Sequence, residues 1–218
     1  MAEERRAVGK FKFLTKDGSI SDAILYCHME TVALGSGMYY LAKKDVPADS
    51  AGLSLVASTA SSMGKLFGTG LPTEAPFSQF VYPLSGVAKV LAATVYATYR
   101  AYRTGGTVYG YVRILIRKND GVVREFIANY ASACSNFGSS WATHTGADYS
   151  FAEYSVVDET DWLEIDYYAN VTKTSAGKYA YLRIDDNSLD TADQTRSQDW
   201  SFQTSGPPPA GGVLAQVI

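Results

Sequence analysis

Hydrophobic and polar side chains alternate over much of the chain between residues 80 and 186. In one stretch, Val108 and Ile114 fall on one face of an extended segment, and Tyr109 and Arg113 fall on the other. A period of two residues is typical of β-strands that have one buried and one solvated face. The pattern therefore predicts antiparallel strands that are covered on one side.

The same alternation recurs further along the chain. Leu163, Ile165 and Tyr167 take the positions expected to face inward, and Glu164 and Asp166 take the positions expected to face water. Two carboxyl groups on one strand face could carry glycoside hydrolysis. The sequence gives no sign of the cleft that such chemistry needs, so a solvated strand face is the favoured interpretation.

Turn signals separate these strands at Gly105-Gly106 and at Asn119-Asp120-Gly121. No long segment keeps a helical period, which disfavours an α/β fold. The sequence therefore predicts an all-β protein, built as an antiparallel and jelly-roll-like β-sandwich.

Three regions are expected along the chain. Residues 1–75 form an N-terminal arm with a small β-rich region, residues 76–200 form the sandwich, and residues 201–218 form an extended tail rich in proline and glycine. The tail ends in an apolar segment, which is either disordered or adds to the sheet edge of a neighbouring copy. The candidate residues for linking copies are apolar and lie near the two ends of the chain: Phe11, Phe13, Val213, Leu214, Val217 and Ile218.

Composition narrows the class of partner. The 218 residues are 46% hydrophobic, and 19 Lys and Arg against 22 Asp and Glu give a net charge of −3. This balance argues against a general nucleic-acid binder, which would carry a basic patch. No segment is apolar and long enough to span a membrane, and the first residues lack a secretory signal. We therefore expect synthesis in a host cytoplasm.

Reactive and metal-binding side chains are sparse. Cys27 and Cys134 are far apart in the sequence and are expected to be buried apolar residues, although a single bridge between them remains open. His28 and His144 are too isolated to supply a zinc site. No nucleophile-elbow motif accompanies them, so no catalytic role is expected for either histidine.

One acidic cluster is a candidate calcium site. Calcium prefers six to eight oxygen ligands, which loops of β-sandwiches often supply. Solvated turns capped by Asp and Asn explain the same composition and are the favoured interpretation. The candidate ligands are Asp185, Asp186, Asn187 and Asp190. No other cofactor is expected.

Aromatic side chains gather in the segment 96–113, which is expected to contain a hairpin. They could form a platform that stacks sugar rings, a subunit interface rich in Tyr and Arg, or ordinary sheet cover. The residues of this face are Tyr96, Tyr99, Tyr109, Tyr111 and Arg113.

Several segments together resemble a known module. They are YPLSGV, ATYRAYR, ILIRKNDG, YSVVDETDWLEIDYY and KYAYLRIDD, and they cover roughly residues 82–186. They are similar to a β-sandwich module of uncharacterised surface and virion proteins from archaea, thermophiles and their viruses. The resemblance implies a jelly-roll-like sandwich displayed on a particle or surface, and it implies no catalytic residues.

Together these observations predict a structural subunit of a virus particle or a comparable assembly, without enzymatic activity. Its partners would be copies of itself and other particle proteins, and its location would be the virion. The alternative is a carbohydrate- or cell-surface-binding module of a fibre or receptor-binding protein.

Overall fold

The computed structural model describes residues 11–23, 25–44, 61–67, 75–131, 133–173, 178–184 and 194–198. Every regular element in these ranges is a β-strand, and they contain no helix. The expected all-β class is confirmed, and the arrangement in several antiparallel sheets is consistent with a β-sandwich.

The strands begin and end as follows. The first half of the chain holds β1 (Phe11–Thr15), β2 (Ile20–Ala23), β3 (Leu25–Leu34), β4 (Gly37–Lys44), β5 (Ser61–Phe67), β6 (Ala75–Pro83), β7 (Val87–Val90) and β8 (Ala93–Arg103). The second half holds β9 (Thr107–Arg117), β10 (Val123–Ala131), β11 (Ala142–Thr145), β12 (Tyr149–Phe151), β13 (Tyr154–Ser155), β14 (Trp162–Lys173), β15 (Lys178–Ile184) and β16 (Gln194–Gln198).

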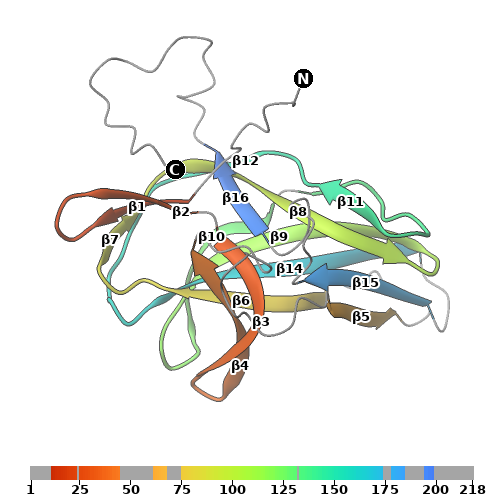
Figure 1. The fold of residues 1–218 in the computed structure, drawn as a ribbon, viewed down its shortest axis with the longest axis horizontal. Helices are drawn as coiled ribbons and strands as arrows, with labels where there is room; N and C mark the ends of the chain where they lie inside the picture. Colours follow the sequence, from red (N-terminus) through yellow and green to blue (C-terminus); the bar gives the residue numbers. More distant parts are fainter. Residues whose placement is uncertain are drawn as a thin grey trace, which may run out of the picture.

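These strands form two sheets (Figure 1). The smaller sheet has the order β13-β7-β1-β2. The larger follows the path β10-β9-β14-β6-β4-β3-β16-β8-β15-β5, with β11 and β12 also paired to β8. Its pairs are antiparallel except β4 with β6, which run parallel through Tyr40↔Phe80 and Leu41↔Val81. The chain therefore departs at one point from the fully antiparallel arrangement expected.

One large hydrophobic core joins the two sheets. It takes Phe13 from β1 and Phe80, Ile114 and Tyr167 from three strands of the larger sheet, all at most 2% exposed. The ring of Phe80 meets the edge of Tyr167, with centroids 5.9 Å apart. Strands from both sides of residue 75 contribute to this core and pair with one another. The expected boundary between residues 75 and 76 therefore does not separate the strands into two sheets. The tail 201–218 lies outside the described residues.

The second face of β6 and β14 is covered by the β3–β4 hairpin. Leu34 and Tyr39 of this hairpin form a smaller buried cluster with Val81. At the tip, the backbone N–H of Gly35 donates to the carbonyl of Asn119, 3.1 Å away in the β9–β10 turn. In the sheet, β6 and β14 lie between β4 and β9, so this contact requires the hairpin to reach across both strands.

The turn between β9 and β10 matches the sequence prediction. The Gly121 N–H donates to the Lys118 carbonyl at 2.9 Å, and Gly121 has a φ of +86°, a conformation that glycine adopts without strain. The expected hairpin across Gly105-Gly106 is wrong: β8 pairs with β11, β12, β15 and β16, whereas β9 pairs with β10 and β14. Both strands find other neighbours, so no β8–β9 ladder forms in the described structure.

Strand β10 is an edge of the larger sheet and is irregular. Its register against β9 shifts three times, between Val123 and Glu125, between Phe126 and Ala128, and between Ala128 and Ala131. Tyr130, within the last shift, has a φ of +50°, which is rare for a residue other than glycine. The backbone N–H and C=O groups along this edge are therefore not spaced regularly enough to pair with a further strand.

Candidate functional site

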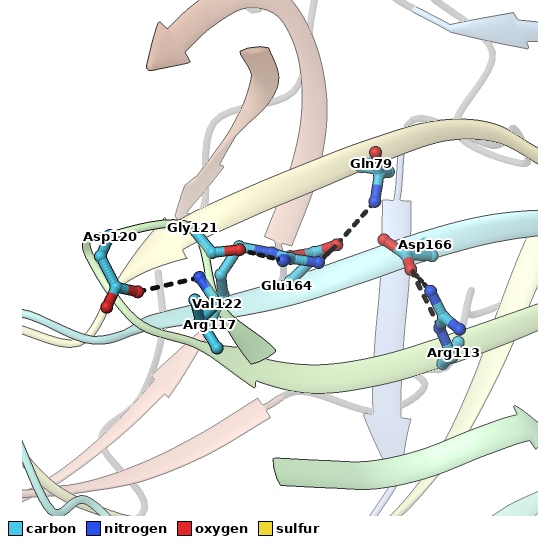
Figure 2. Close-up of polar contacts among 8 residues, drawn as sticks. All are labelled: Gln79, Arg113, Arg117, Asp120, Gly121, Val122, Glu164 and Asp166. Atoms are coloured by element: carbon cyan, nitrogen blue, oxygen red, sulfur yellow. Dashed lines mark hydrogen bonds and ion pairs between the residues drawn. The ribbon is translucent and has the colours of Figure 1, made fainter. Parts of the chain in front are cut away.

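Two arginines of β9 and two carboxyl groups of β14 form a buried charge network on the second face of the larger sheet (Figure 2). Its members are Arg113, Arg117, Glu164 and Asp166. Glu164 and Asp166 are 0% exposed and Arg117 is 7% exposed. The sheet register places Asp166 directly opposite Arg113, at the distance where cross-strand side chains interact.

Glu164 is held from two sides. Arg117 donates from Nε to Oε2 and from Nη2 to Oε1, the latter at 2.9 Å, in a bidentate pair. Gln79 of β6 donates to the same Oε1, also at 2.9 Å. Arg117 further donates from Nη1 to the Gly121 carbonyl at 2.6 Å. The network therefore ties β6 and β14 to the β9–β10 turn.

Arg113 forms the other half of the network and is surrounded by aromatic rings. It donates from Nε and Nη2 to Asp166 Oδ2 at 3.1 and 2.8 Å. Its guanidinium carbon lies 4.6 Å from the ring centroid of Tyr168, 5.2 Å from that of Phe126 and 5.7 Å from that of Tyr130. Such contacts stabilise a cation over a ring face. We call Arg113, Phe126, Tyr130 and Tyr168 the aromatic–arginine cluster.

Asp166 is the least satisfied member of the network. Its Oδ1 is buried and receives no hydrogen bond from the described residues. Burial raises the pKa of this carboxyl well above its usual range, and the charge of Glu164 raises it further, against the opposing effect of Arg113. The protonated form of Asp166 is therefore favoured in the folded protein relative to the unfolded chain.

Stability is expected to carry a signature of Asp166 between pH 4 and neutrality. The unfolded chain loses this proton near an ordinary pKa of about 3.9, whereas the folded protein retains it to higher pH. The folded state then binds more protons, so the contribution of Asp166 to the free energy of unfolding falls as pH rises, by at most about 1.4 kcal/mol per pH unit. Urea unfolding of the native protein and of Asp166→Asn across pH 4–7 measures the difference.

His144 makes this comparison necessary, because burial lowers its pKa and gives the opposite trend below pH 6.5. His144 is present in both proteins, so its effect cancels in the difference between them. A difference that stays constant over the pH range would contradict the raised pKa of Asp166.

The expectation that Glu164 and Asp166 face water is wrong. On the face expected to be solvated, the ring of Tyr39 from the β3–β4 hairpin packs over the Arg117 guanidinium. The guanidinium carbon lies 5.0 Å from the ring centroid. Both carboxyl groups are enclosed and paired with arginine, so a glycan chain cannot reach them in this conformation. The arrangement therefore gives no support to the hydrolase alternative.

The predicted tyrosine face is only partly brought together. Tyr109, Tyr111 and Arg113 share the outer face of β9, where the tyrosines are partly buried and Tyr111 stands opposite Tyr168. Tyr96 and Tyr99 belong to β8, which is not a neighbour of β9, and their side chains lie outside what the structure describes. A glycan-binding or interface role for this set stays a prediction.

The expected linking residues have different outcomes. Phe11 and Phe13 are 0% and 2% exposed and pack in the core of their own chain, so neither ring is accessible to a neighbour in this conformation. The four apolar tail residues lie outside the described residues, as do the candidate calcium ligands: Val213, Leu214, Val217, Ile218, Asp185, Asp186, Asn187 and Asp190. Within the described ranges, no group of three or more His, Cys, Asp or Glu side chains could hold a metal ion.

Cys134 and His144 are buried, as the sequence predicts for the cysteine. Cys134 is a free thiol that is 4% exposed, and burial raises its pKa to about 12, which makes the thiol unreactive. The side chain of Cys27 lies outside the description. His144 Nδ1 lies 3.3 Å from Ser135 Oγ, but no carboxylate among the described residues orients the ring, so no catalytic triad forms there.

Comparison with known proteins adds little to this picture. No family model matches the chain, and no curated protein matches it. Among solved structures, the chain is weakly similar to the structure of infectious bursal disease virus Gx strain, with 10% identity, a TM-score of 0.17, and coverage of 87% of this chain and 67% of that one. A likeness at that TM-score carries no argument. The described part of the chain also contains no helix that could cross a membrane.

Proposed function

We propose that this protein is a structural subunit of a virus particle or a comparable assembly, and that it associates with copies of itself and with other particle proteins. The proposal rests first on the fact that the described structure has no accessible group of side chains arranged for catalysis. The paired carboxyl groups are enclosed, the thiol is buried and the histidine lacks an orienting carboxylate. The two carboxyl groups instead pair with arginines of the neighbouring strand.

The observation that carries the proposal is the exposure of the Phe126 ring on an edge strand. This side chain is 48% exposed on the edge strand β10, and its ring packs on the Arg113 guanidinium, whose carbon lies 5.2 Å from the ring centroid. Aromatic residues and arginine are enriched at protein interfaces, and a rigid aromatic side chain loses little conformational freedom on binding. Because β10 is bulged, contact with another copy would use this side-chain surface rather than main-chain pairing.

Replacing Phe126 by serine is expected to raise the protein concentration needed for assembly by about tenfold or more, because a central aromatic contact typically contributes over 1 kcal/mol. The folded monomer should lose only about 1 kcal/mol or less, since the ring is half exposed. Light scattering over a concentration series, with negative-stain electron microscopy of the same samples, measures the effect.

Val157→Ser is the matched control, because Val157 is also apolar and is 73% exposed but lies after β13, outside the cluster. This variant should assemble as the native protein does. The proposal fails if the native protein remains a monomer at high concentration, or if Phe126→Ser assembles at the native concentration.

A further inference from the structure

One half of the larger sheet is basic, although the whole chain carries a net charge of −3. The strands concerned follow one another along the sheet in the order β16-β8-β15-β5, with β11 and β12 also paired to β8. None of these six strands contains Asp or Glu. Their cationic residues are Lys65, Arg100, Arg103, Lys178, Arg183 and Arg196. The balanced total charge therefore conceals a local excess of positive charge.

The strand register places three of the arginines on one face of this half-sheet. Ala101 of β8 and Ala180 of β15 are 0% exposed in the core, so the positions that alternate with them lie on the opposite face. Arg100 and Arg183 occupy two of these positions and stand directly opposite each other. Arg196 of β16 occupies a third, in register with the β8 position four residues before Arg100. We call the positions of Arg100, Arg183 and Arg196 the arginine face.

The pairing of Arg100 with Arg183 favours an anionic partner. Like charges directly opposite on neighbouring strands destabilise a sheet, and a guanidinium group keeps its charge throughout the physiological pH range. The strands that carry the arginine face supply no carboxylate to offset this repulsion. A bound polyanion would remove the repulsion and would gain a charge-assisted contact from each guanidinium group.

The arginine face is open to solvent where β11 joins β8. Thr143 of β11 stands opposite Arg100, and Thr145 lies on the same face two residues further along. Both threonines are exposed. A ligand that lies along β8 can therefore approach the sheet from this side.

Aromatic residues adjoin the arginine positions and narrow the class of polyanion. Tyr102 and Tyr181 stand opposite each other on the same face and stack with centroids 4.7 Å apart. Trp141 meets the Tyr102 ring at 4.6 Å, and all three residues are partly exposed. Arginine binds phosphate through two parallel hydrogen bonds, and its guanidinium plane also stacks on unpaired bases. Arginines beside aromatic residues are typical of surfaces that bind single strands, whereas a sulfated glycan needs only the charges.

We propose that the arginine face binds single-stranded nucleic acid without sequence specificity. Arg100, Arg183 and Arg196 would contact successive backbone phosphates, and the adjoining aromatic residues would favour unpaired bases over a duplex, in which the bases are stacked on one another. All of these strands belong to a single copy of the chain, so the inference does not depend on self-assembly.

Fluorescence anisotropy of the full chain with a labelled oligonucleotide of about 20 nucleotides tests the inference, because this length exceeds the usual site of one β-domain. We expect a dissociation constant of about 1–100 µM at physiological salt, and three phosphate contacts predict that the logarithm of the association constant falls by about 2 for each tenfold rise in salt. The matched duplex and chondroitin sulfate, at equal concentrations of charge, should compete less well than the unlabelled single strand. Absent or salt-independent binding, or preference for either competitor, would overturn the proposal.

The double variant Arg100→Gln with Arg183→Gln locates the site. Its affinity should fall more than tenfold at about 0.1 M salt, and the salt slope should decrease by about 1.4, since each lost phosphate contact removes about 0.7. Its melting temperature should stay the same or rise, because two opposed like charges are gone. Arg196→Gln, on another strand, should reduce the slope by about 0.7 and supplies the test if the double variant does not fold.

Lys16→Gln with Lys89→Gln is the charge-matched control. It also removes two cations, from surface pairs with Glu159 and Glu153 that lie outside this half-sheet, and such pairs contribute little to stability. Binding should remain within about twofold of native, because neither lysine belongs to the arginine face. Equal losses in the two double variants would show that binding follows the total charge of the protein, and this result would reject the arginine face as the site.

Discussion

Replacing Arg117 by methionine is expected to lower the free energy of unfolding by about 3–5 kcal/mol, because it leaves the fully buried Glu164 without its bidentate partner. Gln79 alone cannot compensate a buried negative charge. The change also removes the donor to the Gly121 carbonyl and the cation over Tyr39, so the β9–β10 turn loses an anchor as well. Urea or guanidinium unfolding, followed by fluorescence, measures the loss.

The double variant Arg117→Met with Glu164→Leu distinguishes a lost ion pair from a general packing defect. With both charges gone and similar volumes in place, we expect most of the lost stability to return, since apolar replacements of buried pairs are often neutral. If the double variant is as unstable as the sum of the two single variants, the pair does not act as a coupled unit.

The second large effect is expected at Gly35. This residue has a φ of +57°, and a Cβ there would lie 1.9 Å from the carbonyl oxygen of Asp120. Gly35→Ala therefore combines left-handed strain of about 1–2 kcal/mol with a clash against backbone that cannot rotate away. A total loss of about 3–4 kcal/mol is expected, and the tip of the β3–β4 hairpin should separate from the β9–β10 turn.

Gly18→Ala is the matched control. Gly18 also has a positive φ, of +85°, but a Cβ there would meet no atom within 4 Å. It should cost only the strain, about 1–2 kcal/mol. Equal losses in the two variants, measured by the same unfolding assay, would show that the contact between the two turns contributes nothing.

The local sequence pattern predicts which side of a strand faces the core, but it does not predict what covers the other side. The alternation in β9 and β14 correctly identified Val108, Ile114, Leu163 and Ile165 as inward-facing, because a period of two residues depends only on the strand itself. Whether the other face meets water depends on what folds over it. The β3–β4 hairpin, more than a hundred residues before β14, covers Glu164, and nothing in the sequence around Glu164 records that contact.

The charge network does leave a signal in the sequence. Arg113 and Arg117 fall on the outer face of one strand, and Glu164 and Asp166 fall on the outer face of another. Opposite charges on matching faces favour pairing of those two strands. The acidic pair taken alone, without the two arginines, predicts a solvated face. The neighbours of β8 and β9 could not be inferred in this way, because a short glycine turn does not exclude a crossover to other strands.

The irregular edge at β10 has a consequence for how the protein can be produced. The proposed role as a subunit needed in many copies would require high protein concentration without sheet-to-sheet growth into fibrils. The three register shifts and the left-handed Tyr130 leave no straight row of backbone donors and acceptors along this strand for another strand to extend. The irregular geometry of this edge therefore disfavours fibril growth by strand addition at β10, while contacts through its side chains are not hindered.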